Sequence, residues 1–343
     1  MTAAYVQELR KVEEAAFTWV AAHRDDFALG DDALAAEGHV NGSWKPLGEL
    51  VRVCASVARR TAPTEPLHGY ACDLLAYAWR QTRQGELFVR LQRCEPFATY
   101  PLEVYAAFAA VGMRHAGYEA AAATVARTRG WQLTEQVPTR RLGVLDAERR
   151  TGIRPQDETS PALGRTWPAG LPEPWTFERP SGYALTHVVF HLTDWGRDTD
   201  GVPTDLAAYL TDWLPPWLDT CLDAGMWDLS CELLAVAASL PDPPEPAALR
   251  EAWARISAAQ QATGALPEER GAADQDVRRD FTHCYHSTLM AAFAAALTLR
   301  RLDGAGDGEG DGRSTGRQHT RGTRMRYGTP DLRMPYDGQG ARG

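Results

Sequence analysis

Apolar residues recur at helical spacing through nearly the whole chain, and this pattern most strongly limits the folds open to it. The alternation of apolar and polar residues that marks a half-buried strand is almost absent. Glycines and prolines stand where helices should end, as at Gly117, Gly225 and Pro241. We therefore predict an all-α chain with helices over residues 3–22, 46–60, 68–82, 85–93, 101–116, 118–129, 139–150, 181–196, 203–224, 226–239, 246–263 and 279–301.

Two stretches interrupt this pattern and define the predicted organisation. Residues 152–180 hold six prolines and two tryptophans, which indicates an ordered crossover between an N-terminal helical half, 1–151, and a C-terminal half, 181–302. Residues 303–343 hold eleven glycines and almost no aliphatic side chains, so they cannot bury enough surface to offset the entropy of ordering. We expect this tail to be disordered and the rest to form a single large domain.

Charge and hydropathy exclude some classes of partner. The net charge is −9, and the tail holds seven arginines against six acidic residues, so the negative charge lies in residues 1–302. An acidic body is poorly suited to nucleic acid, whose affinity for proteins rests largely on phosphate neutralisation. The chain has no run of 18 apolar residues and no secretion-signal layout at its N-terminus. We predict a cytoplasmic protein that binds neither nucleic acid nor membrane.

The six cysteines are scattered through the helical segments, and no two of them form a Cys-x-x-Cys pair. In a cytoplasmic chain, isolated cysteines are expected to be reduced, small and buried. The sequence therefore predicts neither a disulfide framework nor a cysteine-based metal site.

The segment from Ser181 to Asp198 holds the strongest candidate for a functional site. If it is helical, His187, His191 and Asp194 share one face, because they stand at positions i, i+4 and i+7. The remainder of that helix is largely apolar. Groups that bind protons are costly to bury unless they are partnered or used, so their presence here suggests a site.

Three interpretations of this face stay open. In the first, the carboxylate of Asp194 orients His187 and raises its basicity for general acid–base catalysis. In the second, the three side chains bind zinc, although the glutamate of the metalloprotease motif does not follow His187. In the third, the histidines are hydrogen-bonded core residues, and Asp194 or Thr193 caps the end of the helix near Gly196. The site prediction takes His187 and Asp194 as catalytic, with no metal or other cofactor.

A second cluster, residues 280–288, opens the last predicted helix. Helix N-termini present free N–H groups that favour anions and lower the basicity of a histidine. We predict that His286 faces His187 across a cavity as its catalytic counterpart, and that Cys284 is a small buried cysteine. For His68 the alternative is a cap at the start of its helix. The residues predicted to bind substrate are His68, Tyr183, His191, Trp195, Trp227, His283 and Tyr285.

Two carboxylates, Asp228 and Glu232, stand four residues apart in another apolar helix. On one buried face they would share a proton and act together as an acid. The alternative is that one of the two carboxylates caps the helix and the other forms a salt bridge, with Arg250 or Arg255 as its partner.

Four segments carry resemblances to known proteins. AWARISAAQQATGALP, at 252–267, resembles the helix-plus-turn repeats of α/α-toroid proteins such as triterpene cyclases and protein prenyltransferase β-subunits. That resemblance implies paired helices in an inner and an outer ring, whereas stacked pairs in a solenoid are the alternative. WKPLGEL at 44–50, PTRRLGVLDAERRTGI at 138–153 and YALTHVVFHLTDWG at 183–196 resemble an actinobacterial family of unknown function. Such families often accompany natural-product biosynthesis enzymes, which implies a biosynthetic context and no particular catalytic residues.

These observations lead to one expected function and two alternatives. We expect a natural-product tailoring enzyme that uses His/Asp acid–base chemistry in a helix-enclosed cavity for a cyclisation, an isomerisation or an elimination. Its substrate would be a small molecule or a peptide. The alternatives are a non-catalytic helical scaffold or binding protein, and a zinc-dependent hydrolase or transferase.

Overall fold

The computed structural model describes residues 3–31, 33–34, 42–153, 160–270 and 281–308. Regular structure within these ranges is helical, apart from an isolated bridge between Met226 and Glu269, so the all-α prediction is confirmed. The α-helices are α1 (Ala3–Ala22), α2 (Trp44–Arg60), α3 (Pro66–Gln81), α4 (Glu86–Cys94), α5 (Tyr100–Ala109), α6 (Ala116–Ala126), α7 (Arg129–Leu133), α8 (Pro138–Thr151), α9 (Ser160–Leu163), α10 (Arg179–Leu192), α11 (Thr204–Ala224), α12 (Trp227–Ser239), α13 (Pro246–Ala259) and α14 (Tyr285–Gly308).

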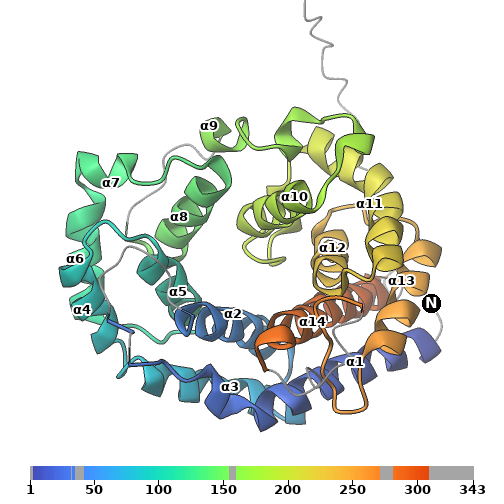
Figure 1. The fold of residues 1–343 in the computed structure, drawn as a ribbon, viewed down its shortest axis with the longest axis horizontal. Helices are drawn as coiled ribbons and strands as arrows, with labels where there is room; N and C mark the ends of the chain where they lie inside the picture. The colour runs from blue at the N-terminus through green and yellow to red at the C-terminus, as the bar shows by residue number, and fades with distance from the viewer. Residues whose placement is uncertain (1–2, 32, 35–41, 154–159, 271–280, 309–343) are drawn as a thin grey trace, which may run out of the picture.

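Six of these helices form a closed inner ring within the described part of the chain. Helices α2, α5, α8, α10, α12 and α14 each contact the next, and α14 returns to α2. Figure 1 shows α1, α3, α4, α6, α7, α11 and α13 around the outside of this ring. The ring combines helices from both predicted halves into one body, whereas a solenoid would leave its first and last helices apart.

The burial pattern of each helix accounts for its layer. Every residue of α5 and all but Ala238 of α12 are buried, as expected for helices covered on all sides. The outer helix α3 buries only a narrow apolar stripe. Aromatic side chains also join inner helices that are not adjacent in the ring, since the ring centroids of Phe190 on α10 and Phe293 on α14 lie 5.6 Å apart. Fully burying one such side chain stabilises the fold by about 1.5–3 kcal/mol.

Several predicted boundaries were wrong. The predicted helix 101–116 ends at Ala109, and the chain turns through Gly112, whose φ of +82° is a left-handed conformation. The predicted helix 279–301 begins at Tyr285 and extends to Gly308, into the region predicted to be a disordered tail. The tail prediction otherwise concerns residues 309–343, which lie outside the described residues, as do 154–159 of the predicted crossover.

Helix α10 ends earlier than predicted, and this matters for the site. The predicted helix continued to Gly196, but α10 ends at Leu192. Asp194, Trp195 and Gly196 follow with φ values of 49°, 57° and 74°, a left-handed turn incompatible with a continuing α-helix.

The six cysteines are free, as predicted. Burial was predicted correctly for Cys54, Cys221, Cys231 and Cys284, whereas Cys72 and Cys94 are exposed. Among the described residues, no helix combines the length and the apolar character needed to cross a membrane.

A close approach between two inner helices depends on Gly48 of α2. A Cβ atom at this position would lie 2.9 Å from Cγ2 of Val104 on α5, which is closer than normal packing allows. A valine in a helix has one strongly preferred χ1 rotamer, so it cannot easily move aside. Any side chain at position 48 would therefore push the two helices apart.

We predict that Gly48→Ala destabilises the protein although alanine favours helices. Overpacking should cost about 1–3 kcal/mol and exceed the propensity gain of about 0.5–1 kcal/mol. Gly69→Ala on α3 is the matched control, because a Cβ at that position would have open space within 4 Å, and it should be stabilising. Urea denaturation of both variants measures the difference. Equal stabilisation by both substitutions would contradict this account of the ring.

Candidate active site

A cavity of about 240 Å³ lies against the inner ring. Helices α2, α5, α8 and α10 and the turn after α10 supply its wall, which mixes charged, imidazole and aromatic side chains. The wall consists of Trp44, Lys45, Gly48, Glu49, Arg52, Tyr100, Glu103, Val104, Arg140, His187, His191 and Trp195. Three predicted site residues, His187, His191 and Trp195, are therefore brought together.

His187 faces this cavity from α10. Its side chain is accessible to solvent, yet the surrounding helices remove much of its hydration, and this desolvation lowers the pKa of His187. Glu232 opposes the shift, while His191, His286 and Arg52 reinforce it. The imidazole is therefore neutral at neutral pH and can accept a proton from a molecule in the cavity.

His191 lies one turn further along α10, with its ring centroid 6.4 Å from that of His187. Its Nδ1 is 3.9 Å from Oδ2 of Asp146 on α8, too far for a hydrogen bond but close enough for electrostatic attraction. Burial alone would raise the pKa of Asp146, but His191 and Arg150 outweigh it and hold the pKa below its ordinary value. Gly143 leaves room for the ring, since a Cβ there would lie 3.0 Å from His191 Nε2.

His286 lies between two carboxylates near the start of α14. Its Nδ1 is 3.0 Å from Oε2 of Glu49 on α2, and its Nε2 is 3.2 Å from Oε1 of Glu232 on α12. Both ring nitrogens donate to these oxygens only when the imidazole is protonated. Burial alone would lower the pKa of His286, but the charge of Glu49 and the two hydrogen bonds raise it well above its ordinary value.

The prediction of lowered basicity at this helix start was therefore wrong for His286. Two buried or half-buried carboxylates act on the ring at hydrogen-bond distance, and they outweigh the weak effect of the helix N-terminus. His286 does not line the cavity itself. It fixes Glu49, which does.

Glu232 is almost fully buried and accepts hydrogen bonds from His286 and from the hydroxyl of Thr186. Burial alone would raise the pKa of Glu232, but these partners and the nearby His187 lower it. The predicted proton sharing with Asp228 was wrong, because Asp228 instead accepts a hydrogen bond from the Tyr183 hydroxyl. The alternative salt bridge was also wrong, since Arg255 pairs with aspartates of α11.

The predicted pairing of Asp194 with His187 was wrong as well. Because α10 ends at Leu192, Asp194 does not share a helical face with the two histidines. Its Oδ1 lies 3.1 Å from Nε of Arg150, and its Oδ2 lies 3.4 Å from Nη1 of Arg197. These ion pairs fix the turn that carries Trp195 into the cavity wall.

The other predicted substrate-binding residues lie away from the cavity wall. His68 is on the outer helix α3, where Nδ1 lies 3.2 Å from the hydroxyl and 3.1 Å from the carbonyl oxygen of Thr61. Burial is the main cause that raises the pKa of Tyr183, and its hydrogen bond to Asp228 adds to the shift. Trp227 is buried under the guanidinium of Arg270, which lies 5.6 Å from the ring centroid.

His283 and Tyr285 surround the start of α14 without reaching the cavity wall. His283 is exposed in a short 3₁₀ helix, and its carbonyl oxygen accepts a hydrogen bond from the amide of Glu268. Tyr285 is buried and stacks on Phe281 with a centroid separation of 5.0 Å. Burial is also the main cause that raises the pKa of Tyr285.

Sequence reasoning missed six charged side chains at the site, one of which is Lys45 of the cavity wall. Glu49 and Arg52 stand in the helical segment beginning WKPLGEL, and Asp146 interrupts the apolar run LGVLDA. Each could have been found as a charge on an apolar helical face. Glu103 and Arg140 could have been found in the same way only with knowledge that α5 and α8 are neighbours.

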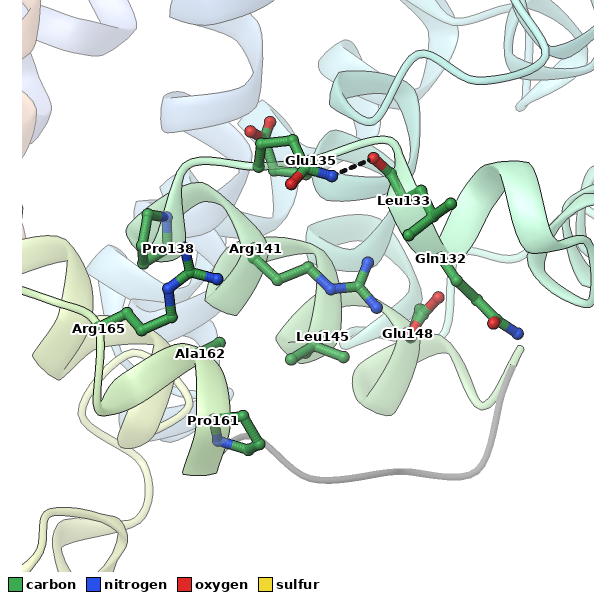
Figure 2. Close-up of a pocket in the computed structure, with 11 residues that line it drawn as sticks. Gln132, Leu133, Glu135, Pro138, Arg141, Leu145, Glu148, Pro161, Ala162 and Arg165 are labelled. Atoms are coloured by element: carbon green, nitrogen blue, oxygen red, sulfur yellow. Dashed lines mark hydrogen bonds between the residues drawn. The ribbon is translucent and has the colours of Figure 1, made fainter.

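A larger pocket of about 370 Å³ lies at the outer layer, between α7, α8 and α9. Figure 2 shows Arg141, Leu145 and Glu148 on α8, with Pro161 and Ala162 of α9 on the other side. Glu148 accepts a hydrogen bond from the Trp131 indole at 2.6 Å. No histidine stands among the described residues that line this pocket, so we take the smaller central cavity as the candidate active site.

Within the described ranges, no three His, Cys, Asp or Glu side chains stand together in a geometry suited to a metal ion. His187 and His191 thus have no third ligand partner there.

Comparison with known proteins gives one match. The model of the family described as Domain of unknown function (DUF6895) matches residues 13–296. No curated protein and no solved structure matches the chain.

We predict that His286→Gln destabilises the protein in a pH-dependent way. The pKa of His286 is higher in the folded protein than in the unfolded chain, where it is about 6.5. The charged ring therefore stabilises the fold in full at pH values below 6.5, and this stabilisation is lost as the pH rises through the pKa of the folded state. At pH 6 the free energy of unfolding of the variant should be about 3 kcal/mol lower than that of wild type, because the buried Glu232 and the half-buried Glu49 lose their counter-charge.

Urea denaturation between pH 5.5 and 9 measures this difference. The difference in free energy of unfolding between wild type and His286→Gln should narrow at alkaline pH, where the wild-type imidazole is neutral. His68→Gln is the control, since the ring of His68 forms hydrogen bonds with Thr61 and not with carboxylates. The difference in free energy of unfolding between His68→Gln and wild type should not narrow at alkaline pH. A constant difference between wild type and His286→Gln at all pH values would contradict a charged His286.

Proposed function

The chain belongs to the DUF6895 family, whose description names no activity, and we propose that it is an acid–base enzyme acting on a small molecule in the central cavity. One observation carries the proposal. Two imidazoles of α10, those of His187 and His191, face the same cavity, and desolvation there lowers the pKa of His187. A titratable group with a displaced pKa at a cavity wall commonly marks an acid–base site.

His187 is the proposed base. It lines the cavity, is accessible, and is neutral at neutral pH, so its free nitrogen is ready to take a proton. The imidazolium that forms is stabilised by the nearby charge of Glu232. His191, steadied by Asp146, offers a second imidazole on the same wall.

The chemistry begins with removal of a proton from a carbon beside an electron-withdrawing group. The electron pair left behind moves into that group. Return of the proton at a neighbouring atom gives an isomerisation, expulsion of a leaving group gives an elimination, and attack on an electrophilic carbon of the same molecule gives a cyclisation. His187 carries the proton in each case.

His286 has a positioning role in this proposal rather than a direct one. Its two nitrogens are occupied by Glu49 and Glu232, so it holds Glu49 at the cavity wall and does not itself meet the substrate. This differs from the expected role as the second catalytic histidine.

The size of the cavity favours a small molecule over a peptide. About 240 Å³ lies below the usual range of drug-sized ligand sites. We also propose a tailoring role in natural-product biosynthesis and a toroid-like architecture, both of which rest on the sequence resemblances together with the closed ring of helices.

The test uses proton exchange, because this step does not require knowledge of the full reaction. Purified protein is incubated in D₂O with a panel of small carbonyl compounds, neutral and anionic, and loss of C–H signals is followed by NMR. Wild type should exchange at least one compound. His187→Gln should slow that exchange by roughly 10²–10⁴-fold, the usual contribution of a general base.

Folding must remain intact for this comparison. The free energy of unfolding of His187→Gln should lie within about 1 kcal/mol of that of wild type. The ring of His187 faces the cavity, and its removal leaves no hydrogen-bond partner unpaired among the described residues. His68→Gln, on the outer helix α3, is the matched control and should exchange at the wild-type rate. Undiminished exchange by a folded His187→Gln protein would overturn the proposal.

A further inference from the structure

The charges of the cavity wall are not fully balanced among themselves. Glu103 is neutralised by Arg140, whose Nη2 and Nη1 lie 2.7 Å and 3.3 Å from its two oxygens. Glu49 faces His286 at 3.0 Å and Lys45 at 4.0 Å. Both wall carboxylates are therefore compensated, which leaves the guanidinium of Arg52.

Arg52 projects from α2 into this wall without a carboxylate partner among the described residues. Its one hydrogen bond there runs from Nη2 to the backbone carbonyl oxygen of Glu103, at 3.1 Å. Its guanidinium lies over the ring of Trp195, 4.4 Å from the ring centroid, and this contact restrains the group. Burial lowers the pKa of Arg52 to about 10, so the side chain stays charged at neutral pH.

A cation held in this way is poorly hydrated, and in the described part of the chain no carboxylate lies within salt-bridge distance of it, although the charges of Glu103, Asp146 and Glu49 act on it from further away. Such a charge is costly to bury unless a partner supplies the opposite sign. The remaining N–H groups of a guanidinium form a planar fork that matches a carboxylate or a phosphate. Stacking on Trp195 orders this fork in advance, which reduces the entropy lost on binding.

We propose that Arg52 is the anchor for an oxyanion group, carboxylate or phosphate, of the small molecule that enters the central cavity. This inference rests on the proposed function, since it names the substrate class of the same site. Arg52 and His187 line one cavity of about 240 Å³, so an anchored oxyanion brings the adjacent carbon within the small space shared with the base.

Binding measurements on the full chain test the anchor. Propionate, its neutral amide propionamide and methylphosphonate are titrated while the histidine ring signals are followed by NMR. Wild type should bind at least one oxyanion tenfold or more tightly than the amide. The ratio between propionate and methylphosphonate identifies whether the site prefers a carboxylate or a phosphate-like group.

Variants locate the binding. Arg52→Gln should weaken oxyanion binding at least tenfold and abolish the preference over the amide, whereas Arg52→Lys should retain part of it. Arg90→Gln, at an exposed arginine of α4, is the matched control and should bind like wild type. Oxyanion binding that survives Arg52→Gln, or a wild type that binds the amide as tightly as the acids, would overturn the proposal.

The two proposals fail in different ways. His187→Gln should still bind the oxyanion, because Arg52 is intact, while losing proton exchange. If His187→Gln loses proton exchange but wild type does not prefer the oxyanions over the amide, the Arg52 anchor is refuted and the role of His187 as base stands. Oxyanion preference without His187-dependent exchange would refute the acid–base function and leave a binding site. If Arg52→Gln fails to fold, the acid–amide comparison on wild type and the Arg52→Lys variant still decide the matter.

Discussion

The imidazolium of His286 between Glu49 and Glu232 is the interaction on which the centre of this protein depends. It joins α14, α2 and α12, and so links the end of the ring to its beginning. Two carboxylates this close in a poorly solvated interior would repel each other strongly without a cation between them. The bridge therefore lets the ring close around polar groups instead of a wholly apolar core.

The same requirement for compensation shapes the rest of the wall. Glu103 is held by Arg140, and Asp146 by Arg149 and Arg150. Against this background, two groups of the cavity wall stand out because no charged partner among the described residues lies within salt-bridge distance of them. They are the neutral imidazole of His187 and the guanidinium of Arg52, and both face the cavity. Because the other charges of the wall are balanced, His187 is free to accept a proton and Arg52 is free to bind a negatively charged group.

Local pattern predicted much of the fold but little of this network. The start and end of α1 and the length of α12 follow from apolar spacing and from punctuation by Gly225 and Pro241. His187, His191 and Trp195 were found because polar or aromatic side chains interrupt an apolar helix. Asp194 was assigned wrongly because the pattern did not reveal the left-handed turn after Leu192.

Contacts between distant helices explain the remaining errors. His286 pairs with Glu49 across 237 positions of sequence, and no local rule indicates that separation. The pKa direction of His286 consequently could not be predicted from its place near a helix start. Glu103 and Arg140 were missed for the same reason, since their pairing appears only once α5 and α8 stand side by side in the ring.

The most direct test of this account is an NMR titration of the histidine ring signals in the folded protein, with His187→Gln and His286→Gln used to assign the resonances. The account predicts that His187 titrates below pH 6.5 and His286 well above it. Two histidines that both titrate near pH 6.5, or in the reverse order, would contradict it.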